Sequence, residues 1–332
     1  MTNTMNAEPA RNFLDGLRLG DPVTVHNVTM FPLLGEDRPG PAYTTLHRAL
    51  ASKTASVSEV SEGGSVPELL FRNDDDIAVF LLDGEELIGA KQNRILNISI
   101  LVAAGTTIRI PVSCVEQGRW QYTSGDFSSS GRTLFAQARK AKMMRVSENL
   151  QFSASRASDQ GEVWDHIQEK LGSLGARSAS SAMSDAYESR SQSVEDIAGK
   201  LAAVPEQRGA LFAIGSRVEG LELFDRHESL VTLLPSIVRG YALDAVVHEG
   251  PAAAGPSMEE ASRLLHAVNV ARVQRYPAVG LGQDLRLESE DAFGGALDVD
   301  GRVIHLSAFA GKAETSRSGR GRAPSGWRSR GH

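Results

Sequence analysis

The sequence predicts an α+β fold, in which an N-terminal β-sandwich or open-barrel-like sheet joins a helical layer and a C-terminal mixed α/β portion. Residues 21–122 show mainly strand patterns, and residues 131–205 show mainly helical spacing of apolar side chains. Residues 209–310 mix the two without a regular alternation of strand and helix, which is typical of α+β proteins. We therefore expect a single domain over residues 15–310.

The composition is that of a soluble globular protein and disfavours several functional classes. The chain has 332 residues, of which 41% are hydrophobic and 23% charged. Its formal net charge of −6 gives no general attraction to nucleic acid or to anionic membranes. Apolar runs such as 98–104 are far shorter than the roughly 20 residues of a membrane-spanning helix. With Cys114 as the single cysteine and no signal-peptide pattern, we expect a cytoplasmic protein without membrane contact.

Both ends of the chain are predicted to be disordered. These are residues 1–14 and residues 311–332, and the C-terminal segment concentrates Arg, Gly and Ser without any hydrophobic period. Arg-Gly segments bind RNA in some proteins, but the acidic remainder of this chain favours a solvated tail over nucleic-acid binding.

Strand signals in the first block come from alternation, apolar runs and turn residues. Residues 21–31 alternate apolar and polar side chains, and residues 77–82 form a continuous apolar run. Asp83 and Gly84 follow that run directly. Asp-Gly between two apolar segments is a strong hairpin signal, because both central residues take positive φ. The sequence therefore predicts a hairpin that pairs residues 77–82 with residues 85–90.

Two further strands are predicted at residues 94–102 and 107–115, with a turn between them. Pro111 lies within the second of these and lacks a backbone donor. We therefore expect that strand to lie at a sheet edge or to contain a bulge.

Helices are predicted where apolar residues recur at helical spacing. The segments are 133–146, 159–175 and 194–201. A later helix is predicted to begin at Ser257, because Ser257 and Glu260 have the spacing of a capping box.

Residues 209–310 contain further helix-capping and turn patterns. Asp225 and Glu228 form a capping-box variant, with Asp225 as the N-cap of a helix that Pro235 should kink or split. Asp300 and Gly301 lie between two apolar segments and predict a second hairpin.

A run of polar side chains interrupts the predicted strands of the first block. It consists of Lys91, Gln92, Asn93 and Arg94. If the strand continues through the run, Gln92 and Arg94 lie on the apolar face, whereas Lys91 and Asn93 lie on a mixed face. The mixed face is the better candidate for a ligand, because it places several donors side by side on a rigid strand.

Carboxylates and an aromatic residue accompany this run. Glu85 and Glu86 alternate across a strand, so they do not form a matched acid–base pair. Glu116 follows the next strand and precedes Arg119 and Trp120. Basic side chains hold phosphate or carboxylate, amides recognise base or sugar edges, and Trp stacks on bases. The predicted ligand is therefore anionic and nucleotide-like, with the candidate binding residues Lys91, Gln92, Asn93, Arg94, Arg119 and Trp120.

A purely structural interpretation of the same residues stays open. Arg94 and Glu116 would then form an ion pair that seals one end of the sheet, and Gln92 and Asn93 would satisfy irregular backbone. Cys114 is interpreted as a small buried apolar residue rather than a nucleophile, because it has apolar parity and no histidine nearby in sequence.

Motifs for several common chemistries are absent from the sequence. It contains no phosphate-binding P-loop, no dinucleotide-binding glycine pattern, no zinc-protease motif and no nucleophile elbow. The histidines are scattered, and a single cysteine excludes a thiolate zinc cluster. We therefore predict no metal site and assign no cofactor.

Two motifs carry a resemblance to a known family. At DGEELIGAKQNRILNISI (83–100) and IPVSCVEQGRWQY (110–122), the chain resembles the ARG and Rhodanese-Phosphatase-superfamily-associated protein domain family. Segments 151–167 and 220–225 extend the resemblance over about residues 15–309. It implies that both motifs contribute to one site, formed by Gly84, Glu85, Glu86, Gly89, Lys91, Gln92, Asn93, Arg94, Cys114, Glu116, Gly118, Arg119 and Trp120.

The family name implies a function without assigning an activity. It records association with ADP-ribosylglycohydrolase-type and rhodanese-phosphatase-type proteins, which implies a place in NAD or ADP-ribose metabolism. The favoured hypothesis is a binding or sensor domain for an anionic, nucleotide-like ligand. An alternative is a hydrolase or transferase acting on an ADP-ribose derivative, with Glu86 or Glu116 as general base. A third is a non-catalytic protein-interaction scaffold.

Overall fold

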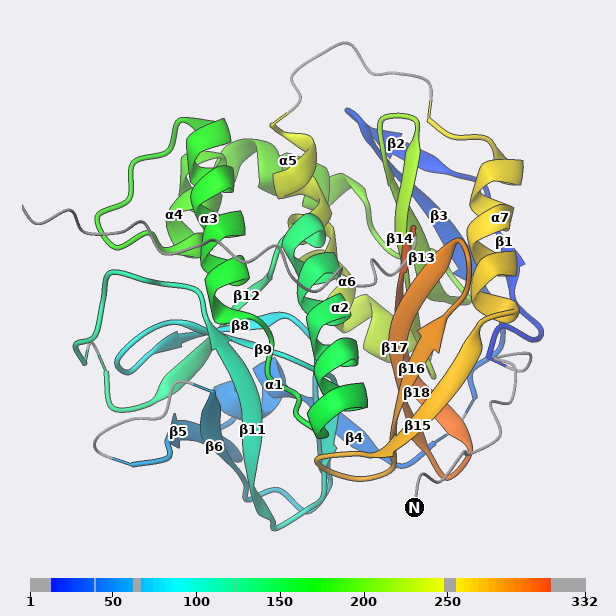
Figure 1. The fold of residues 1–332 in the computed structure, drawn as a ribbon. Helices are drawn as coiled ribbons and strands as arrows, with labels where there is room; N and C mark the ends of the chain where they lie inside the picture. Colours follow the sequence, from blue (N-terminus) through cyan, green and yellow to red (C-terminus); the bar gives the residue numbers. More distant parts are fainter. Residues whose placement is uncertain (1–12, 39, 62–66, 123, 248–254, 312–332) are drawn as a thin grey trace, which may run out of the picture.

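A large antiparallel sheet and two smaller sheets pack around a layer of helices in the computed structural model (Figure 1). The structure describes residues 13–38, 40–61, 67–122, 124–247 and 255–311. Strands and helices do not alternate regularly along the chain, so the α+β prediction is confirmed. The two predicted disordered ends lie outside the described residues, apart from their innermost positions.

The larger sheet has nine strands, in the order β1-β3-β13-β14-β18-β17-β16-β15, with β2 paired to β3. The N-terminal strand β3 pairs antiparallel with β13, which lies far along the chain. The first strands therefore belong to the same sheet as the C-terminal strands. The bounds are β1 Arg18–Leu19, β2 Val23–Val25, β3 Val28–Leu34, β13 Gln207–Ile214, β14 Arg217–Phe224, β15 Arg272–Pro277, β16 Gln283–Glu288, β17 Ala292–Val299 and β18 Arg302–Ala310.

The remaining strands form a six-stranded sheet, in the order β12-β8-β9-β11-β6-β5, and a three-stranded sheet, in the order β10-β7-β4. The first and last strands of the six-stranded order, β12 and β5, contact each other. This sheet is therefore curled, as the predicted open barrel requires. The bounds are β4 Tyr43–Thr45, β5 Ala55–Glu59, β6 Glu68–Asn73, β7 Ala78–Leu81, β8 Glu85–Gly89, β9 Arg94–Leu96, β10 Ile100–Val102, β11 Thr107–Cys114 and β12 Phe127–Thr133.

Helices fill the space between the sheets and cover one outer face. Helix α6 contacts both β12 and β13, so it connects the six-stranded sheet to the nine-stranded sheet. Helix α7 packs against β14 and β17 on the other face of the nine-stranded sheet (Figure 1). The predicted helical segments are confirmed. The bounds are α1 Leu46–Ala51, α2 Ala136–Ser153, α3 Gln160–Leu174, α4 Met183–Ser189, α5 Ser191–Lys200, α6 His227–Ala245 and α7 Met258–Asn269.

The predicted hairpin at Asp83 and Gly84 is wrong, although the turn itself is present. Gly84 has a φ of 79°, and the amide of Glu85 donates to the carbonyl of Leu82 over 3.1 Å. However, β7 pairs with β4 and β10, whereas β8 pairs with β9 and β12. The turn therefore sends the chain from one sheet into another. Residues 77–82 therefore do not pair with residues 85–90.

The predicted continuous strand over residues 94–102 is also divided between two sheets. β9 belongs to the six-stranded sheet and β10 to the three-stranded sheet, with residues 97–99 between them. Pro111 lies inside its sheet rather than at an edge. The proline is tolerated because the pairing of β11 changes at this residue. β11 pairs with β6 up to Pro111 and with β9 from Val112 onward.

Two of the three turn and cap predictions for residues 209–310 are confirmed, and one is wrong. Asp300 and Gly301 form a hairpin turn between β17 and β18, with φ values of 54° and 76°, as predicted. The capping box of Ser257 and Glu260 is also confirmed. Asp225 is not the N-cap of α6. Its side chain instead binds the Tyr43 hydroxyl over 2.5 Å and the Arg226 guanidinium over 2.8 Å, and Arg226 is the N-cap.

Pro235 lies within α6, which is not split by it. The helix is buried along much of its length, by residues that include Leu230, Ile237 and Tyr241. Packing against both sheets therefore maintains the helix through a residue that interrupts its hydrogen-bond ladder.

Candidate functional site

The inner face of the curled sheet is apolar except at one end. The strand registers align Glu59 with Leu69, Leu69 with Ile110, and Cys114 with Arg94. Because directly opposite residues in a sheet point to the same face, these side chains share the inner face. Arg94 and Glu59 therefore bring a cation and a carboxylate from different strands into an otherwise apolar interior.

Arg94 is fully buried and incompletely hydrogen-bonded. Its Nη1 donates to the side-chain and main-chain oxygens of Gln92 over 3.1 and 3.3 Å. Its Nη2 lies 3.8 Å from Glu59 Oε1, which is too far for a hydrogen bond. Among the described residues, neither Nε nor Nη2 of Arg94 has a hydrogen-bond partner, and neither do the two Glu59 oxygens. Unused donors and acceptors thus lie side by side.

Two exposed aromatic rings border this pair. Lys91 Nζ lies 5.4 Å from the centre of the Trp120 ring and 5.1 Å from that of Tyr122, and Arg94 Cζ lies 5.7 Å from the Trp120 ring. Trp120 is 45% exposed and Tyr122 is 53% exposed. Cation–π contact therefore holds the basic side chains against rings that keep a solvent-facing surface.

Asn93, Arg119 and Glu116 form a separate group that holds the chain in place. Arg119 Nη2 lies 2.6 Å from Glu116 Oε2 and donates to Asn93 Oδ1 over 3.0 Å. Arg119 Nη1 donates to the Ala90 carbonyl over 2.8 Å. The predicted Arg94–Glu116 ion pair is therefore wrong, because each residue has a different partner. This group supports the loop that carries Lys91.

Glu116 is engaged at both oxygens. Oε1 accepts a hydrogen bond from Ser180 over 3.0 Å, and Oε2 accepts one from the amide of Asn93 over 3.3 Å. Burial acts to raise the pKa of Glu116, but the hydrogen bonds from Arg119 and Ser180 outweigh it and lower the pKa. This geometry suits an anchoring carboxylate better than a general base.

Glu86 lies on the opposite face of the sheet from Arg94, because Glu86 pairs with Ile95. It is fully buried, and burial raises its pKa to about 7, with Ser130 and Arg132 opposing. Neighbouring Glu85 is also buried, with a pKa raised to about 7 by burial, and it accepts a hydrogen bond from Ser129 over 2.8 Å. Both carboxyls therefore titrate near neutrality, and Glu86 points away from the basic residues of the polar run.

Cys114 is buried on the inner face, as expected. Burial raises the pKa of its thiol to about 11, although Arg94 acts to lower it. The Gln160 side chain accepts from its amide and donates to its carbonyl, both over 2.8 Å. A neutral, covered thiol is consistent with a packing role.

The sequence interpretation missed a buried charge network between the sheets. Arg139 of α2 donates to Asp83 over 2.9 Å and to Glu222 over 2.6 and 3.2 Å. His305 Nε2 lies 2.9 Å from Glu222, and Lys142 binds Asp83. One helix thus ties the β7–β8 turn to the large sheet. Glu222 in β14 and His305 in β18 lie among apolar residues in the sequence, and this pattern could have indicated the network.

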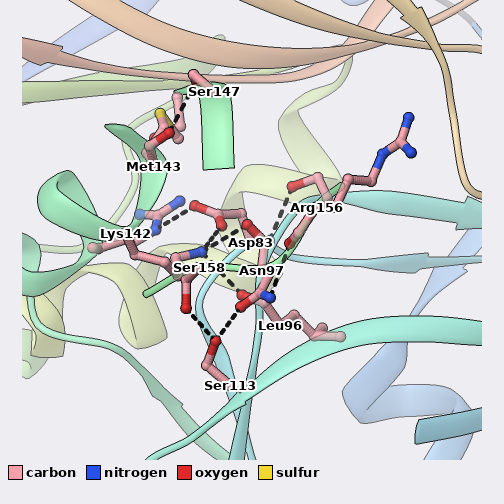
Figure 2. A network of polar contacts seen from close by, with 12 residues as sticks. Asp83, Leu96, Asn97, Ser113, Lys142, Met143, Ser147, Arg156 and Ser158 are labelled. Carbon is pink, nitrogen blue, oxygen red and sulfur yellow. Dashed lines mark hydrogen bonds and ion pairs between the residues drawn. The ribbon is translucent and has the colours of Figure 1, made fainter. Parts of the chain in front are cut away.

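Figure 2 shows how the network continues from Lys142 into β9 and β11. Lys142 donates to the carbonyls of Leu96 and Asn97 over 3.0 and 2.9 Å, and Ser113 donates to Asn97 Oδ1 over 2.7 Å. Burial lowers the pKa of Lys142 to about 8, with Asp83 opposing. These contacts account for the break in the predicted strand, because the backbone carbonyls turn toward the lysine.

A separate hollow lies between α2, α3 and the large sheet. It has a volume of about 670 Å³. Its lining contains similar numbers of basic and acidic side chains, and Lys170 and Asp244 pair across 2.6 Å. None of the candidate residues of the polar run lines it. Its balanced charges point to no particular ligand class.

No helix in the described part of the chain has the length and apolar character to cross a membrane.

Of the comparisons with known proteins, one gives a match. No curated protein and no solved structure gives a significant match. A family model, by contrast, matches residues 16–309, which is nearly the whole chain. The protein therefore belongs to the ARG and Rhodanese-Phosphatase-superfamily-associated Protein domain family.

Proposed function

We propose that this domain binds an anionic, nucleotide-like ligand at the end of the curled sheet where Arg94 and Glu59 meet Trp120. The observation that carries the proposal is the buried Arg94, whose Nε and Nη2 have no hydrogen-bond partner among the described residues. Leaving a buried donor unpaired costs about 1–3 kcal/mol, and more for a charged group. A ligand oxygen that accepts from Arg94 recovers this energy.

The neighbouring groups define the chemistry of the ligand. Glu59 offers acceptors beside the Arg94 donors, which suits a ribose hydroxyl, and Lys91 adds a second positive charge for a phosphate. Trp120 and Tyr122 keep exposed faces on which a base can stack. Gln92 holds Arg94 in place, and Asn93 and Arg119 hold the loop. The six predicted binding residues thus divide into three that meet the ligand and three that support them.

The family name supports ADP-ribose or NAD as the ligand to test first, although the family carries no assigned activity. In this proposal, the protein acts in NAD or ADP-ribose metabolism in the cytoplasm. It would operate together with ADP-ribosylglycohydrolase-type proteins.

One observation favours a hydrolase or transferase as the second candidate. Glu86 has a pKa of about 7, which is suitable for general acid–base chemistry at neutral pH. Its position on the face opposite to Arg94 is the obstacle. Under this alternative, ADP-ribose would be turned over, and Glu86→Gln would abolish turnover while binding persisted. Binding without turnover in the wild-type protein identifies a binding domain.

Trp120→Ala is expected to weaken ADP-ribose binding by about tenfold or more, because stacking on an aromatic side chain contributes roughly 1–3 kcal/mol per base. A thermal-shift panel with ADP-ribose, NAD, ADP and inorganic phosphate measures this. A ligand at about a hundred times its dissociation constant adds about 2.7 kcal/mol of stability.

The matched control is Phe152→Ala, which removes an aromatic residue that is 84% exposed and lies on α2, away from the polar run. The control should shift with ligand as the wild type does. Equal ligand shifts in Trp120→Ala and Phe152→Ala would contradict the proposed site. A wild-type protein that responds to none of the four ligands would favour the scaffold hypothesis.

A further inference from the structure

A second hollow, on the large sheet, is lined by four arginines. It has a volume of about 480 Å³ and lies where the segment around residue 38 meets β13, β15 and the β17–β18 turn. The charged residues of its lining are Arg38, Arg208, Arg275, Arg302, Asp37 and Asp298. Arginine therefore dominates this surface, in a protein whose net charge is −6.

Arg208 forms the buried base of the hollow. It is 3% exposed, and it donates to the Phe224 carbonyl over 3.0 Å and to the Glu36 carbonyl over 2.7 Å. These bonds fasten the segment that carries Asp37 and Arg38. Burial lowers the pKa of Arg208, and the Arg38 guanidinium is the next cause. The like charges of these two arginines are therefore close enough to repel each other.

The two carboxylates of the lining are occupied by backbone amides. Asp37 accepts from the amide of His227 over 2.7 Å, and Asp298 accepts from that of Gly301 over 3.1 Å. Neither carboxylate, nor the Arg302 guanidinium, forms an ion pair with any residue that the structure describes. The lining thus contains four guanidinium groups and two carboxylates.

We propose that this hollow is a binding site for a diphosphate group. Guanidinium groups bind phosphate oxygens with paired hydrogen bonds, and arginines from separate strands reach the two phosphoryl groups of one diphosphate from different sides. The volume lies within the range of small-molecule sites. The site is separate from the Arg94 region and does not depend on the function proposed for it.

Calorimetric titration of the full-length protein with inorganic pyrophosphate tests this site. We expect saturable binding by the wild type and a loss of affinity of about tenfold or more in Arg302→Gln. Arg302 is exposed, so its replacement should leave folding intact. Arg272→Gln is the matched control, because it removes the same charge from an exposed position on β15 that is outside the lining.

The outcomes separate a built site from general attraction. Arg272→Gln should change pyrophosphate affinity by less than about twofold. Equal losses in Arg302→Gln and Arg272→Gln would overturn the proposal, because they would indicate charge attraction without a site. Wild-type protein that does not bind pyrophosphate, or that binds sulfate equally well, would overturn it too.

Discussion

Replacing Glu222 with alanine is expected to lower the free energy of unfolding by about 3–5 kcal/mol, the usual cost of removing one member of a buried ion pair. Glu222 is fully buried and accepts hydrogen bonds from Arg139 and Ser307, while His305 lies 2.9 Å away. Its removal leaves the Arg139 charge buried with Asp83 as its remaining carboxylate partner.

Urea or thermal unfolding of the variant measures this loss. Glu228→Ala is the control, because Glu228 forms an exposed ion pair with Arg48 over 2.8 Å, and such pairs contribute at most about 1 kcal/mol. If Glu222→Ala costs no more than Glu228→Ala, then the network does not tie the two sheets together as described.

Replacing Glu86 with glutamine is expected to stabilise the protein by about 3 kcal/mol at about pH 8 and to have little effect near pH 4.5. Burial raises the pKa of Glu86 from 4.5 to about 7, so the folded state binds this proton more tightly than the unfolded state. The wild-type protein therefore loses stability as the pH rises from about 4.5 to 7. Glutamine resembles the protonated acid and escapes this loss.

The measurement is the free energy of unfolding of both proteins across this pH range. Glu288→Gln removes a carboxylate from an exposed strand end and should show no comparable dependence on pH. Parallel stability curves for the wild type and Glu86→Gln would show that the fold does not raise the pKa of Glu86. Its suitability for acid–base chemistry at neutral pH would then be lost as well.

Features set by local sequence were predicted correctly. The helices predicted over 133–146 and 159–175 form over 136–153 and 160–174, and Ser257 forms its capping box with a residue three positions away. Asp300 and Gly301 specify a turn whose flanking strands pair with each other. In each case the deciding contacts lie within a few residues along the chain.

Features set by distant partners were not predictable in this way. Asp83 has the same local turn signal as Asp300, but Arg139 and Lys142, more than fifty residues away, bind it in the interior. The strands on either side of the turn then join different sheets. No local pattern distinguishes an exposed Asp-Gly turn from one that a buried cation holds.

The candidate site was predicted in part for the same reason. Lys91, Arg94 and Trp120 were predicted as one set of binding residues and do meet, because their two segments lie at the ends of strands that pair. The predicted assignment of Lys91 and Arg94 to opposite faces of a continuous strand is wrong, because no strand runs through residues 91–93. Glu59 was missed, since it comes from a distant strand and only the curl of the sheet brings it to Arg94. Tyr122 lies two residues beyond Trp120 but was not identified as part of the aromatic border.

The most direct test of the central claim is the calorimetric dissociation constant of ADP-ribose for a protein that lacks the inner charge pair. In Arg94→Met/Glu59→Gln, both charges are removed together, so that neither is left buried alone. The control, Arg109→Met/Glu68→Gln, removes an exposed pair with a separation of 3.1 Å from the same sheet. Both double variants also carry Arg302→Gln, so that binding at the arginine-lined hollow contributes little to the measured ADP-ribose affinity.

We predict that the inner double variant binds ADP-ribose at least about tenfold more weakly than the control, while its stability is similar. Equal affinities in the two double variants would contradict the account, because the Arg94 and Glu59 pair would then have no part in ligand binding.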